Sequence, residues 1–492
     1  MNKRLILKVL GMIMIIEAAL MLLPVIVAVI YRESHWLHFV LTAVGLAILG
    51  SLLYLIKPKN TLLHARDGFL IVGLAWLVLS AAGAVPFVIS GSIPNYLNAL
   101  METVSGFTTT GVTILDDIEA LSHSMLFWRS FTHWVGGMGI LVFMLSITPI
   151  AGGGSALYLM KAESPGPITE KVSPKISSTA KWLYVIYFAI TGAEVIALCI
   201  AKLPLFNSFL ISFATMGTGG FSYLNTSLMD MTWAQQTIAT VFMLLAGLNF
   251  SLYFLIATGK GISAIKDEEF RWYAAIYVIA TVVITVNVYM TGKFETLAEA
   301  IHHVAFGVAS VITTTGFVSC DMDVWPWFSK GLLLLIMFIG ACAGSTAGGL
   351  KVSRFAIMIK SCRRYLRKMM HPRSVSVLRF NKKELPKDVH HTVMFYIIAL
   401  VLLTCISMIV VTLDPKSDFT TAFSAVSTTI NNNGVAFGGA VGSMSGFAWY
   451  SKIIFIIDML IGRLEIFPII ILFATLVSPF RWISKKIKRR AD

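Results

Sequence analysis

Four short stretches rich in threonine, asparagine and glycine are the residues best suited to binding a bare cation. Residues 105–112 read Ser-Gly-Phe-Thr-Thr-Thr-Gly-Val, and residues 310–317 repeat this pattern closely. Residues 213–220 and 427–435 are looser copies. Glycine permits backbone conformations with positive φ, which lets successive carbonyl oxygens point inward. Rings of carbonyl oxygens can replace the hydration shell of a cation, and dehydrated K⁺ is the ion that we expect.

The glycines that end these stretches recur at a steady interval. They are Gly111, Gly219, Gly316 and Gly434, roughly 100 residues apart. One stretch alone would be interpreted as an ordinary polar loop between helices. Four copies at matched positions instead indicate one pore built from four covalently joined repeats.

The elements that must position these loops are membrane helices. Hydrophobic residues make up 57% of the 492 residues and charged residues only 13%, whereas soluble proteins carry about 25% charged residues. Many apolar runs approach or exceed the roughly 20 residues needed to cross a bilayer. The segment before each loop is too short to span and suits a half-helix entering from outside. These segments are residues 95–107, 206–216, 297–312 and 418–430.

The sequence therefore predicts an all-α polytopic membrane protein with four pseudo-symmetric helix–pore-loop–helix repeats around a central pore, plus two N-terminal transmembrane helices. Non-helical backbone at membrane depth is tolerated only where it is buried in protein or lines a water-filled cavity, so we expect the four loops to converge on one axis. Two helices in each unit and the two N-terminal helices give ten full spans. The expected divisions are 1–66 for the N-terminal helices and 67–160, 161–262, 263–387 and 388–492 for the repeats.

The net charge of +14 is distributed as in a membrane protein and not as in a nucleic-acid-binding one. If the spans alternate in direction, the cytoplasmic stretches hold most of the 39 lysine and arginine residues but a minority of the 25 acidic residues. This positive-inside bias predicts that both termini are cytoplasmic. Residues 360–387 form a basic connector, for which two partners fit equally well: membrane lipid headgroups and a regulatory subunit.

Residues 340–349 interrupt an otherwise apolar span with ten small residues, Gly-Ala-Cys-Ala-Gly-Ser-Thr-Ala-Gly-Gly. Such residues are poor helix formers and allow close backbone approach. One interpretation is a tight contact between helices, and the other is a flexible intramembrane loop that acts as a gate below the filter. A phosphate-binding loop is excluded, because Leu350 stands where that motif requires lysine.

Arg463 lies in the middle of the last predicted span, where a charge is costly and usually functional. It could form a structural ion pair with Asp458 or Glu465. Alternatively it faces the pore beneath the filter, where it would repel cations and hold the glycine-rich loop through its carbonyl groups. Glu17 and Glu194 also fall within spans, and the sequence offers no partner for them.

Several acidic residues flank the predicted filter loops. They could concentrate cations at the outer mouth of the pore or be ordinary solvated loop charges. These residues are Glu102, Asp116, Asp117, Asp321 and Asp323.

Seven stretches carry a resemblance to a known family. They lie at residues 105–113, 134–140 (Trp-Val-Gly-Gly-Met-Gly-Ile), 162–167 (Ala-Glu-Ser-Pro-Gly-Pro), 219–222, 313–317, 344–351 and 462–467 (Gly-Arg-Leu-Glu-Ile-Phe). In combination they resemble the membrane subunit of the Trk/Ktr/HKT superfamily of potassium transporters. The two extra N-terminal helices resemble its TrkH branch. The resemblance implies a K⁺ uptake protein of the bacterial inner membrane, working as a homodimer under a TrkA-type ring of cytoplasmic nucleotide-binding subunits.

The resemblance also implies roles for particular residues. The K⁺ filter would be formed by backbone carbonyls of Thr109, Thr110, Gly111, Val112, Gly217, Thr218, Gly219, Thr314, Thr315, Gly316, Phe317, Asn432, Asn433 and Gly434. The gate would be formed by Gly344, Ser345, Thr346, Gly348, Gly349, Lys351 and Arg463. The fourth loop departs from the family pattern, because Asn433-Gly434-Val435-Ala436 lacks the proline and second glycine often found there. No covalently bound cofactor is implied.

Two other functional classes fit the sequence less well. An ion-coupled secondary carrier for another solute usually has two repeats and a binding site at broken helices, whereas this chain has four similar loops. A membrane enzyme would need a nucleophile–base pair or clustered acids within its spans, which the sequence lacks. A K⁺ transporter is therefore the prediction, with passive conduction and symport of H⁺ or Na⁺ both open.

Overall fold

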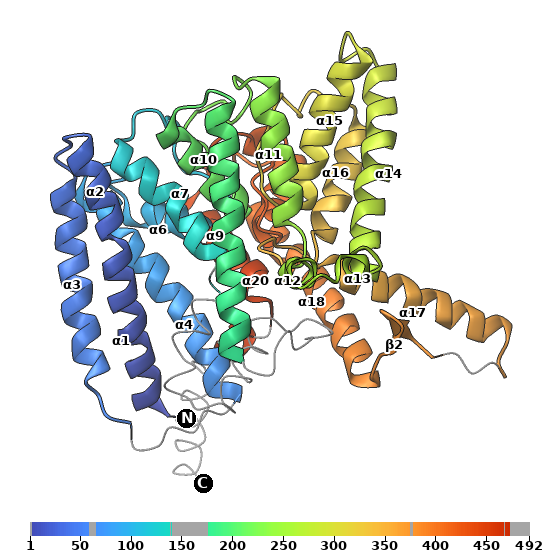
Figure 1. The fold of residues 1–492 in the computed structure, drawn as a ribbon, viewed down its shortest axis with the longest axis horizontal. Helices are drawn as coiled ribbons and strands as arrows, with labels where there is room; N and C mark the ends of the chain where they lie inside the picture. The colour runs from blue at the N-terminus through green and yellow to red at the C-terminus, as the bar shows by residue number, and fades with distance from the viewer. Residues whose placement is uncertain are drawn as a thin grey trace.

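The computed structural model describes residues 2–58, 65–137, 139, 176–373, 377–466 and 468–472. The described chain is almost entirely helical (Figure 1). The motif at residues 162–167 and the expected boundary between the first two repeats lie outside the described residues. A small antiparallel hairpin, β1 (Arg379–Phe380) and β2 (Lys383–Glu384), is an exception to the predicted all-α fold.

The first predicted span is bent at Met21 into α1 (Lys3–Leu20) and α2 (Leu22–Ile30). It packs against α3 (Trp36–Tyr54). A Cβ atom added at Gly11 would lie 2.6 Å from the carbonyl oxygen of Gly50, and one added at Gly50 would lie 2.7 Å from that of Gly11. Glycine at both positions thus lets the two backbones touch.

Four units follow, each with a long helix, a half-helix, a loop and a second helix. The first comprises α4 (Ala65–Gly83), α5 (Val85–Ile89), α6 (Tyr96–Phe107) and α7 (His123–Gly137). The second comprises α9 (Ile176–Ile200), α10 (Leu205–Gly217), α11 (Trp233–Ala246), α12 (Phe250–Ala257) and α13 (Gly261–Ile265). The third comprises α14 (Glu268–Met290), α15 (Leu297–Ile312), α16 (Trp327–Ile339) and α17 (Val352–Met370). The fourth comprises α18 (Lys387–Val411), α19 (Phe419–Ile430), η1 (Gly438–Ala440) and α20 (Trp449–Leu464).

The second helix of the second unit is broken in its middle. Among the described residues, six helices are long and apolar enough to cross a membrane. A seventh span results if α11 and α12 are counted together, although they are bent by 91°. The break falls at Gly247–Asn249, where the side chain of Asn249 accepts a hydrogen bond from the Ser251 N–H at 2.9 Å and caps the new helix.

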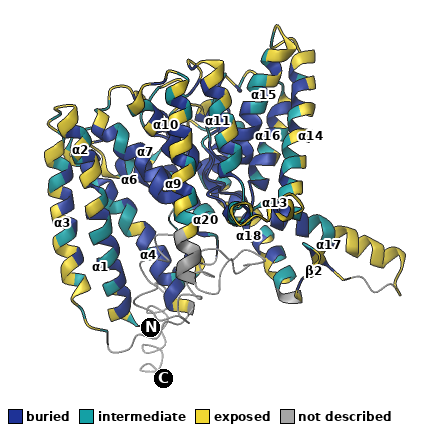
Figure 2. Ribbon diagram, in the orientation of Figure 1, coloured by how far each residue is buried: buried dark blue, intermediate teal, exposed yellow. Residues whose placement is uncertain are grey.

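Burial divides the described bundle into a closely packed centre and an exposed apolar rim. Figure 2 shows buried residues at the centre of the bundle and exposed residues on the outer faces of α3, α9 and α14. The exposed residues on these faces are apolar, for example Ile48 at 60% and Val282 at 56% exposure. Such surfaces suit hydrocarbon and not water, as predicted for a polytopic membrane protein.

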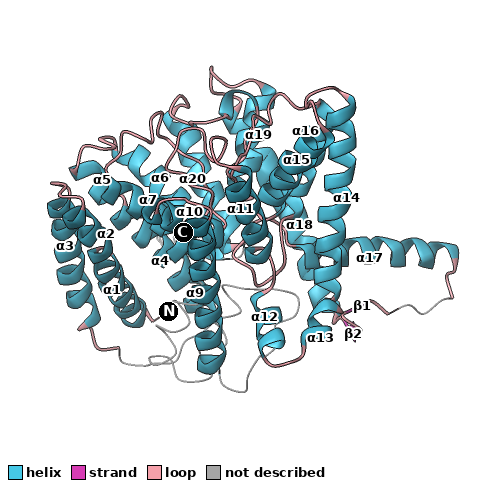
Figure 3. Cartoon of the chain, turned by 45° about the horizontal axis from the view of Figure 1, so that its top comes forward, coloured by secondary structure: helices cyan, strands magenta, loops and turns pink. Residues whose placement is uncertain are grey.

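The helix α17 leaves the bundle sideways, at the end where α14 begins (Figures 1 and 3). Its first half is buried against the bundle, whereas residues 362–370 are exposed. The predicted basic connector thus forms a projecting helix followed by the hairpin. It presents several arginine side chains to the surroundings.

Candidate ion-conducting site

The four half-helices begin and end where the sequence predicts, to within one residue. Three of them have N-cap side chains that accept backbone N–H groups: Asn95 before α6, Thr296 before α15 and Asp418 before α19. Each half-helix of 12 to 16 residues is about 18–24 Å long, which is less than the bilayer core of about 30 Å. Their C-terminal ends, with partial negative charge, therefore meet the loops at membrane depth.

The four loops share the backbone conformation that ends the half-helix, although the glycine of the fourth loop, Gly434, does not have a positive φ as the other three do. A single non-glycine residue in each has a left-handed φ: 56° at Thr109, 54° at Thr218, 55° at Thr314 and 51° at Asn432. In each loop the N–H of this residue bonds to the carbonyl three residues earlier, and the next N–H bonds to the carbonyl five residues earlier, as for Thr110 and Ser105. These paired hydrogen bonds are a Schellman ending of the half-helix. The four loops are thus structural equivalents.

This equivalence corrects the register predicted for the second loop. Two residues after the left-handed residue stand Gly111, Gly220, Gly316 and Gly434, so that Gly220 and not Gly219 matches the other glycines. Gly219 is buried, whereas the four matched glycines are each partly exposed. The sequence contains two adjacent glycines here, and only the hydrogen bonds at the end of α10 decide between them.

The matched glycines meet in a ring. A Cβ atom added at Gly111 would collide with the carbonyl oxygen of Gly219, and one at Gly220 would collide with that of Thr315. One added at Gly316 would lie 2.5 Å from the Cα of Gly434. One at Gly434 would lie 3.4 Å from the carbonyl oxygen of Gly111, which closes the circle. Each loop therefore contacts the next, and a side chain at most of these positions would push two loops apart.

Some of the carbonyl groups predicted to form the filter are free and others are not. The Phe317 carbonyl accepts from the Ser310 hydroxyl at 2.6 Å, and the Gly217 carbonyl accepts from the Thr218 hydroxyl at 2.7 Å. In each loop, three consecutive carbonyl oxygens, from the left-handed residue to the matched glycine, accept no hydrogen bond from any other described residue. They belong to Thr109–Gly111, Thr218–Gly220, Thr314–Gly316 and Asn432–Gly434. Buried carbonyl groups are nearly always paired. A cluster of free carbonyls at the meeting point of four loops is thus suited to coordinating a cation.

The side chains of the fourth loop brace its neighbours. Asn432 donates from Nδ2 to Oγ1 of Thr110 at 2.9 Å, and Asn433 donates from Nδ2 to the carbonyl oxygen of Val311 at 2.9 Å. The fourth loop therefore contacts the first and third loops through amide side chains. This bracing, which the sequence did not reveal, accompanies the departure of this loop from the family pattern.

Below the third loop, residues 340–351 form a closed loop between α16 and α17. The Leu350 N–H bonds to the Phe338 carbonyl at 3.1 Å, and the Val352 N–H bonds to the Ala341 carbonyl at 2.9 Å, so the two limbs are joined at the neck. Glu269 at the start of α14 accepts from the N–H groups of both Ala343 and Ser353, at 2.7 and 3.1 Å. The expectation of a tight helix–helix contact is not met here, because the segment is a loop.

The tip of this loop touches the filter and the last helix. The Gly348 N–H donates to Oγ1 of Thr314 at 2.7 Å, directly joining the loop to the third filter segment. Arg463 donates from Nη1 to the Thr346 carbonyl oxygen, and from Nη2 to that of Gly136 at 2.6 Å. Arg463 therefore holds the glycine-rich loop through a carbonyl group, as one of the two interpretations of its sequence position predicted.

The acids near Arg463 have other partners. Glu465 forms an ion pair with Arg354 at 2.5 Å, and Asp458 accepts a hydrogen bond from Ser407 at 2.7 Å. Lys351, whose φ is 79°, donates from Nζ to the carbonyl oxygen of Ala347 within the loop. The predicted gate residues thus lie together, and Arg354, which follows the loop, is paired with Glu465 beside them.

The flanking acids divide into two kinds. Asp116, Asp117 and Asp321 are exposed in the outer loops, and hydrogen bonds with Ser445 and Ser443 lower the pKa of Asp116. Glu102 does not belong at the mouth. It is 1% exposed and forms an ion pair with Arg129 at 2.5 Å. The interpretation of Glu102 as a surface charge is therefore wrong, because it projects from the buried face of a half-helix.

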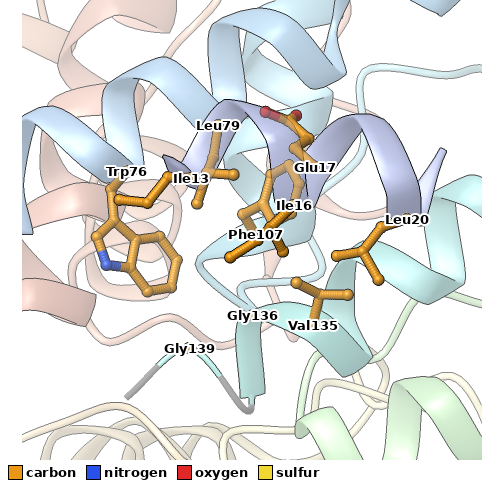
Figure 4. Close-up of a pocket in the computed structure, with 10 residues that line it drawn as sticks. All are labelled: Ile13, Ile16, Glu17, Leu20, Trp76, Leu79, Phe107, Val135, Gly136 and Gly139. Carbon is orange, nitrogen blue, oxygen red and sulfur yellow. The ribbon is translucent and has the colours of Figure 1, made fainter. Parts of the chain in front are cut away.

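Glu17 on α1 lies beside the end of the first half-helix, α6. Its carboxyl group is buried, has no hydrogen-bond partner among the described residues, and lines a cavity of about 50 Å³. Figure 4 shows Glu17 of α1 near Leu79 of α4 and Phe107 of α6. Glu194 is also buried, and its carboxyl oxygens likewise have no partner among the residues that the structure describes.

Comparisons with known proteins agree with this geometry. Residues 37–483 match the TrkH family, described as cation transport proteins. The chain is 36% identical over 481 residues to the Trk system potassium uptake protein TrkH of Salmonella typhimurium, covering 96% of this chain and 99% of the relative. It is 31% identical to an uncharacterized cation transporter of Methanocaldococcus jannaschii, covering 96% and 95%. The crystal structure of the potassium transporter TrkH from Vibrio parahaemolyticus superposes with a TM-score of 0.86 at 34% identity, covering 96% of this chain and 98% of that one.

Proposed function

This chain belongs to the TrkH family of cation transport proteins, and from that premise we propose that it takes up K⁺ across the bacterial inner membrane. Membership of a transport family agrees with the prediction that the protein is not an enzyme. The relatives named for potassium uptake extend over almost the whole chain. The proposal therefore concerns the complete described bundle and not one part of it.

The free carbonyl groups of the four loops carry this proposal. An ion that enters the ring exchanges its water ligands for the carbonyl oxygens of residues around the matched glycines. The C-terminal ends of four half-helices add partial negative charge at the same place. Because each loop is fixed by its Schellman hydrogen bonds, the oxygens are held in position before the ion arrives. Such a site favours K⁺, which is dehydrated at lower cost than Na⁺.

The glycine-rich loop at residues 340–351 acts as the gate. It lies under the third filter segment through the Gly348–Thr314 hydrogen bond, and Arg463 holds its tip. A fixed positive charge beneath a cation filter opposes the passage of K⁺. Opening then requires that Arg463 release Thr346 and that the loop withdraw.

Regulation enters from the cytoplasmic side. The exposed arginines of α17 offer a docking surface for a TrkA-type nucleotide-binding ring, and α17 continues directly from the gate loop. A partner that moves α17 would therefore move the loop. We propose that both termini are cytoplasmic and that the protein forms a homodimer. We also propose that it contacts membrane lipids.

Uptake of radiolabelled Rb⁺ into proteoliposomes that contain the purified chain tests this function. We expect Rb⁺ uptake that K⁺ inhibits and that Na⁺ inhibits much less. Repeating the measurement with an imposed proton gradient separates passive conduction from H⁺ symport. Absence of Rb⁺ flux with and without the gradient, in vesicles where the protein is folded, would contradict the proposal.

A further inference from the structure

A buried polar network lies behind the first two filter loops. Glu102 on α6 and Arg129 on α7 form an ion pair at 2.5 Å, and their side chains are 1% and 2% exposed. Glu102 also accepts hydrogen bonds from the Ile114 N–H at 2.8 Å and from the Thr113 hydroxyl at 3.0 Å. The carboxylate of Glu102 thus anchors the segment that leaves the first filter loop.

Arg129 reaches from this pair to the second loop. Its Nη1 donates to the carbonyl oxygen of Ser222 at 2.8 Å, and its guanidinium lies 3.6 Å from the ring centroid of Phe221. One guanidinium therefore joins Glu102, behind the first loop, to the segment that leaves the second loop. A planar group with several donors is suited to this double contact, which an ammonium group could not reproduce.

His133, one turn further along α7, completes the connection. The Phe221 N–H donates to Nε2 of His133 at 3.2 Å, so the ring proton must be on Nδ1. Nδ1 then donates to the carbonyl oxygen of Gly106 at 2.7 Å. His133 thus joins the end of the first half-helix to the residue after Gly220, and its ring packs against Gly219.

The network is specific to this pair of loops among the described residues. The positions that match Glu102, seven before the left-handed residue of each loop, are Ile211, Gly307 and Ala425. The positions that match Arg129, counted from the start of the second helix, are Ala239, Leu333 and Phe455, all fully buried. A charged pair is therefore not needed to fold a unit of this kind, since three units pack apolar side chains at these places.

We propose that Glu102, Arg129 and His133 are positioning residues that hold the first and second filter loops at a fixed separation, and that this separation sets the discrimination between K⁺ and Na⁺. The inference rests on the proposed function, because it assumes that the ring of loops is the K⁺ filter. Carbonyl oxygens favour the larger ion only while they cannot close around the smaller one. The network of Glu102, Arg129 and His133, which lies behind the first two loops, resists that closure.

The decisive variant is Glu102→Met with Arg129→Met, which replaces the pair by apolar side chains of similar size. Replacing both members of a buried pair in this way is often tolerated, so the protein should reach the membrane. We expect Rb⁺ uptake to persist while Na⁺ becomes a stronger competitor, with a fall in K⁺/Na⁺ selectivity of about tenfold, as for the loss of one good hydrogen bond. Arg129→Lys keeps the charge but not the double contact, and should give an intermediate selectivity.

One control and two fallback variants make the result interpretable. The side chain of Glu33 accepts hydrogen bonds from His123 and Ser124 at the outer end of α7. Because Glu33 is far along the chain from the filter loops, the variant Glu33→Gln should leave the K⁺/Na⁺ selectivity unchanged. If the double variant does not accumulate, Arg129→Lys and His133→Gln decide the question. Unchanged K⁺/Na⁺ selectivity in the folded variants overturns the inference that these three residues set the discrimination, while the proposed function stands. Wild-type protein that does not discriminate K⁺ from Na⁺ overturns both.

Discussion

Arg463 donates a hydrogen bond from Nη1 to the carbonyl oxygen of Thr346, and so ties the last helix of the pore to the tip of the glycine-rich loop. Its second nitrogen binds the carbonyl oxygen of Gly136 at 2.6 Å, at the end of α7. One guanidinium thereby connects the first, third and fourth units below the filter. This arrangement suits a closed gate, because a single side chain fixes three elements.

Arg463→Ala should raise basal K⁺ flux in the absence of any regulatory partner. The substitution removes the bond to Thr346 and the positive charge from the pore. Loss of a charge-assisted hydrogen bond shifts the equilibrium between closed and open loop by about tenfold or more. We therefore expect basal K⁺ flux to rise by that order. Rb⁺ uptake by proteoliposomes measures it. Arg271→Ala, which removes an exposed arginine on α14, serves as the control, and equal fluxes from the two well-folded variants would contradict the gate.

Gly316→Ser should admit more Na⁺. Gly316 has a φ of 90°, and a Cβ atom there would lie 2.5 Å from the backbone of Gly434. The new side chain must displace the fourth loop and distort the ring. We expect a loss of K⁺/Na⁺ selectivity of about tenfold or more, measured by competition between Na⁺ and Rb⁺. Gly331→Ser, at a position where a Cβ atom meets nothing within 4 Å, should retain the wild-type ratio.

The same measurement tests the corrected register. Gly220→Ser should resemble Gly316→Ser, because Gly220 has a φ of 75° and a Cβ atom there would collide with the carbonyl oxygen of Thr315. Wild-type selectivity in folded Gly220→Ser protein would be evidence against equivalence with the other three glycines.

Thr314→Val should weaken the contact between filter and gate. Valine has nearly the shape of threonine but cannot accept the hydrogen bond of the Gly348 N–H. An unsatisfied buried N–H group costs about 1–3 kcal/mol, and withdrawal of the loop relieves this cost. Basal Rb⁺ uptake should therefore rise. At Thr109, whose hydroxyl has no partner among the described residues, the same substitution should cause a smaller rise, and a reversed order would contradict this contact.

Neutralising the exposed arginines of α17 should weaken docking of the regulatory subunit. The variant carries glutamine at Arg363, Arg364 and Arg367, which are all exposed. Each exposed ion pair contributes little, so all three are changed together, and co-purification with the TrkA-type partner is measured. Arg271→Gln is again the matched control. Undiminished co-purification, with weaker binding to vesicles that contain acidic lipids, would assign this surface to lipid headgroups.

Glu33→Gln should lower stability at neutral pH and make no difference in acid. Partial burial opposes ionisation of Glu33, but hydrogen bonds from Ser124 and His123 outweigh it and hold the pKa of this carboxyl below its ordinary value. The contribution is therefore present above the unfolded pKa of about 4.3 and is lost as pH falls through the folded pKa. Thermal unfolding in detergent should show the wild-type protein as the more stable at pH 7, with the difference shrinking as the pH falls below the unfolded pKa of about 4.3. A difference that stays constant with pH would contradict this role.

Much of this architecture follows from the sequence alone. The bounds of the half-helices could be predicted because a short apolar run that ends in threonine and glycine has one physical solution at membrane depth. The position of the loop at residues 340–351 could be predicted because four glycines within ten residues disfavour a continuous helix. The cost of a charge within a span singled out Arg463, and the structure supplies its carbonyl partners.

Only the tertiary structure decided the register of the second loop, the bend between α11 and α12, and the place of Glu102. Gly219 and Gly220 are chemically identical, and they differ only in which hydrogen bonds end α10. Glu102 looked like a surface charge, because sequence does not show which face of a half-helix is buried. Its partner Arg129 lies 27 residues away on another helix, and a contact of that kind is fixed by packing between elements and not by local pattern.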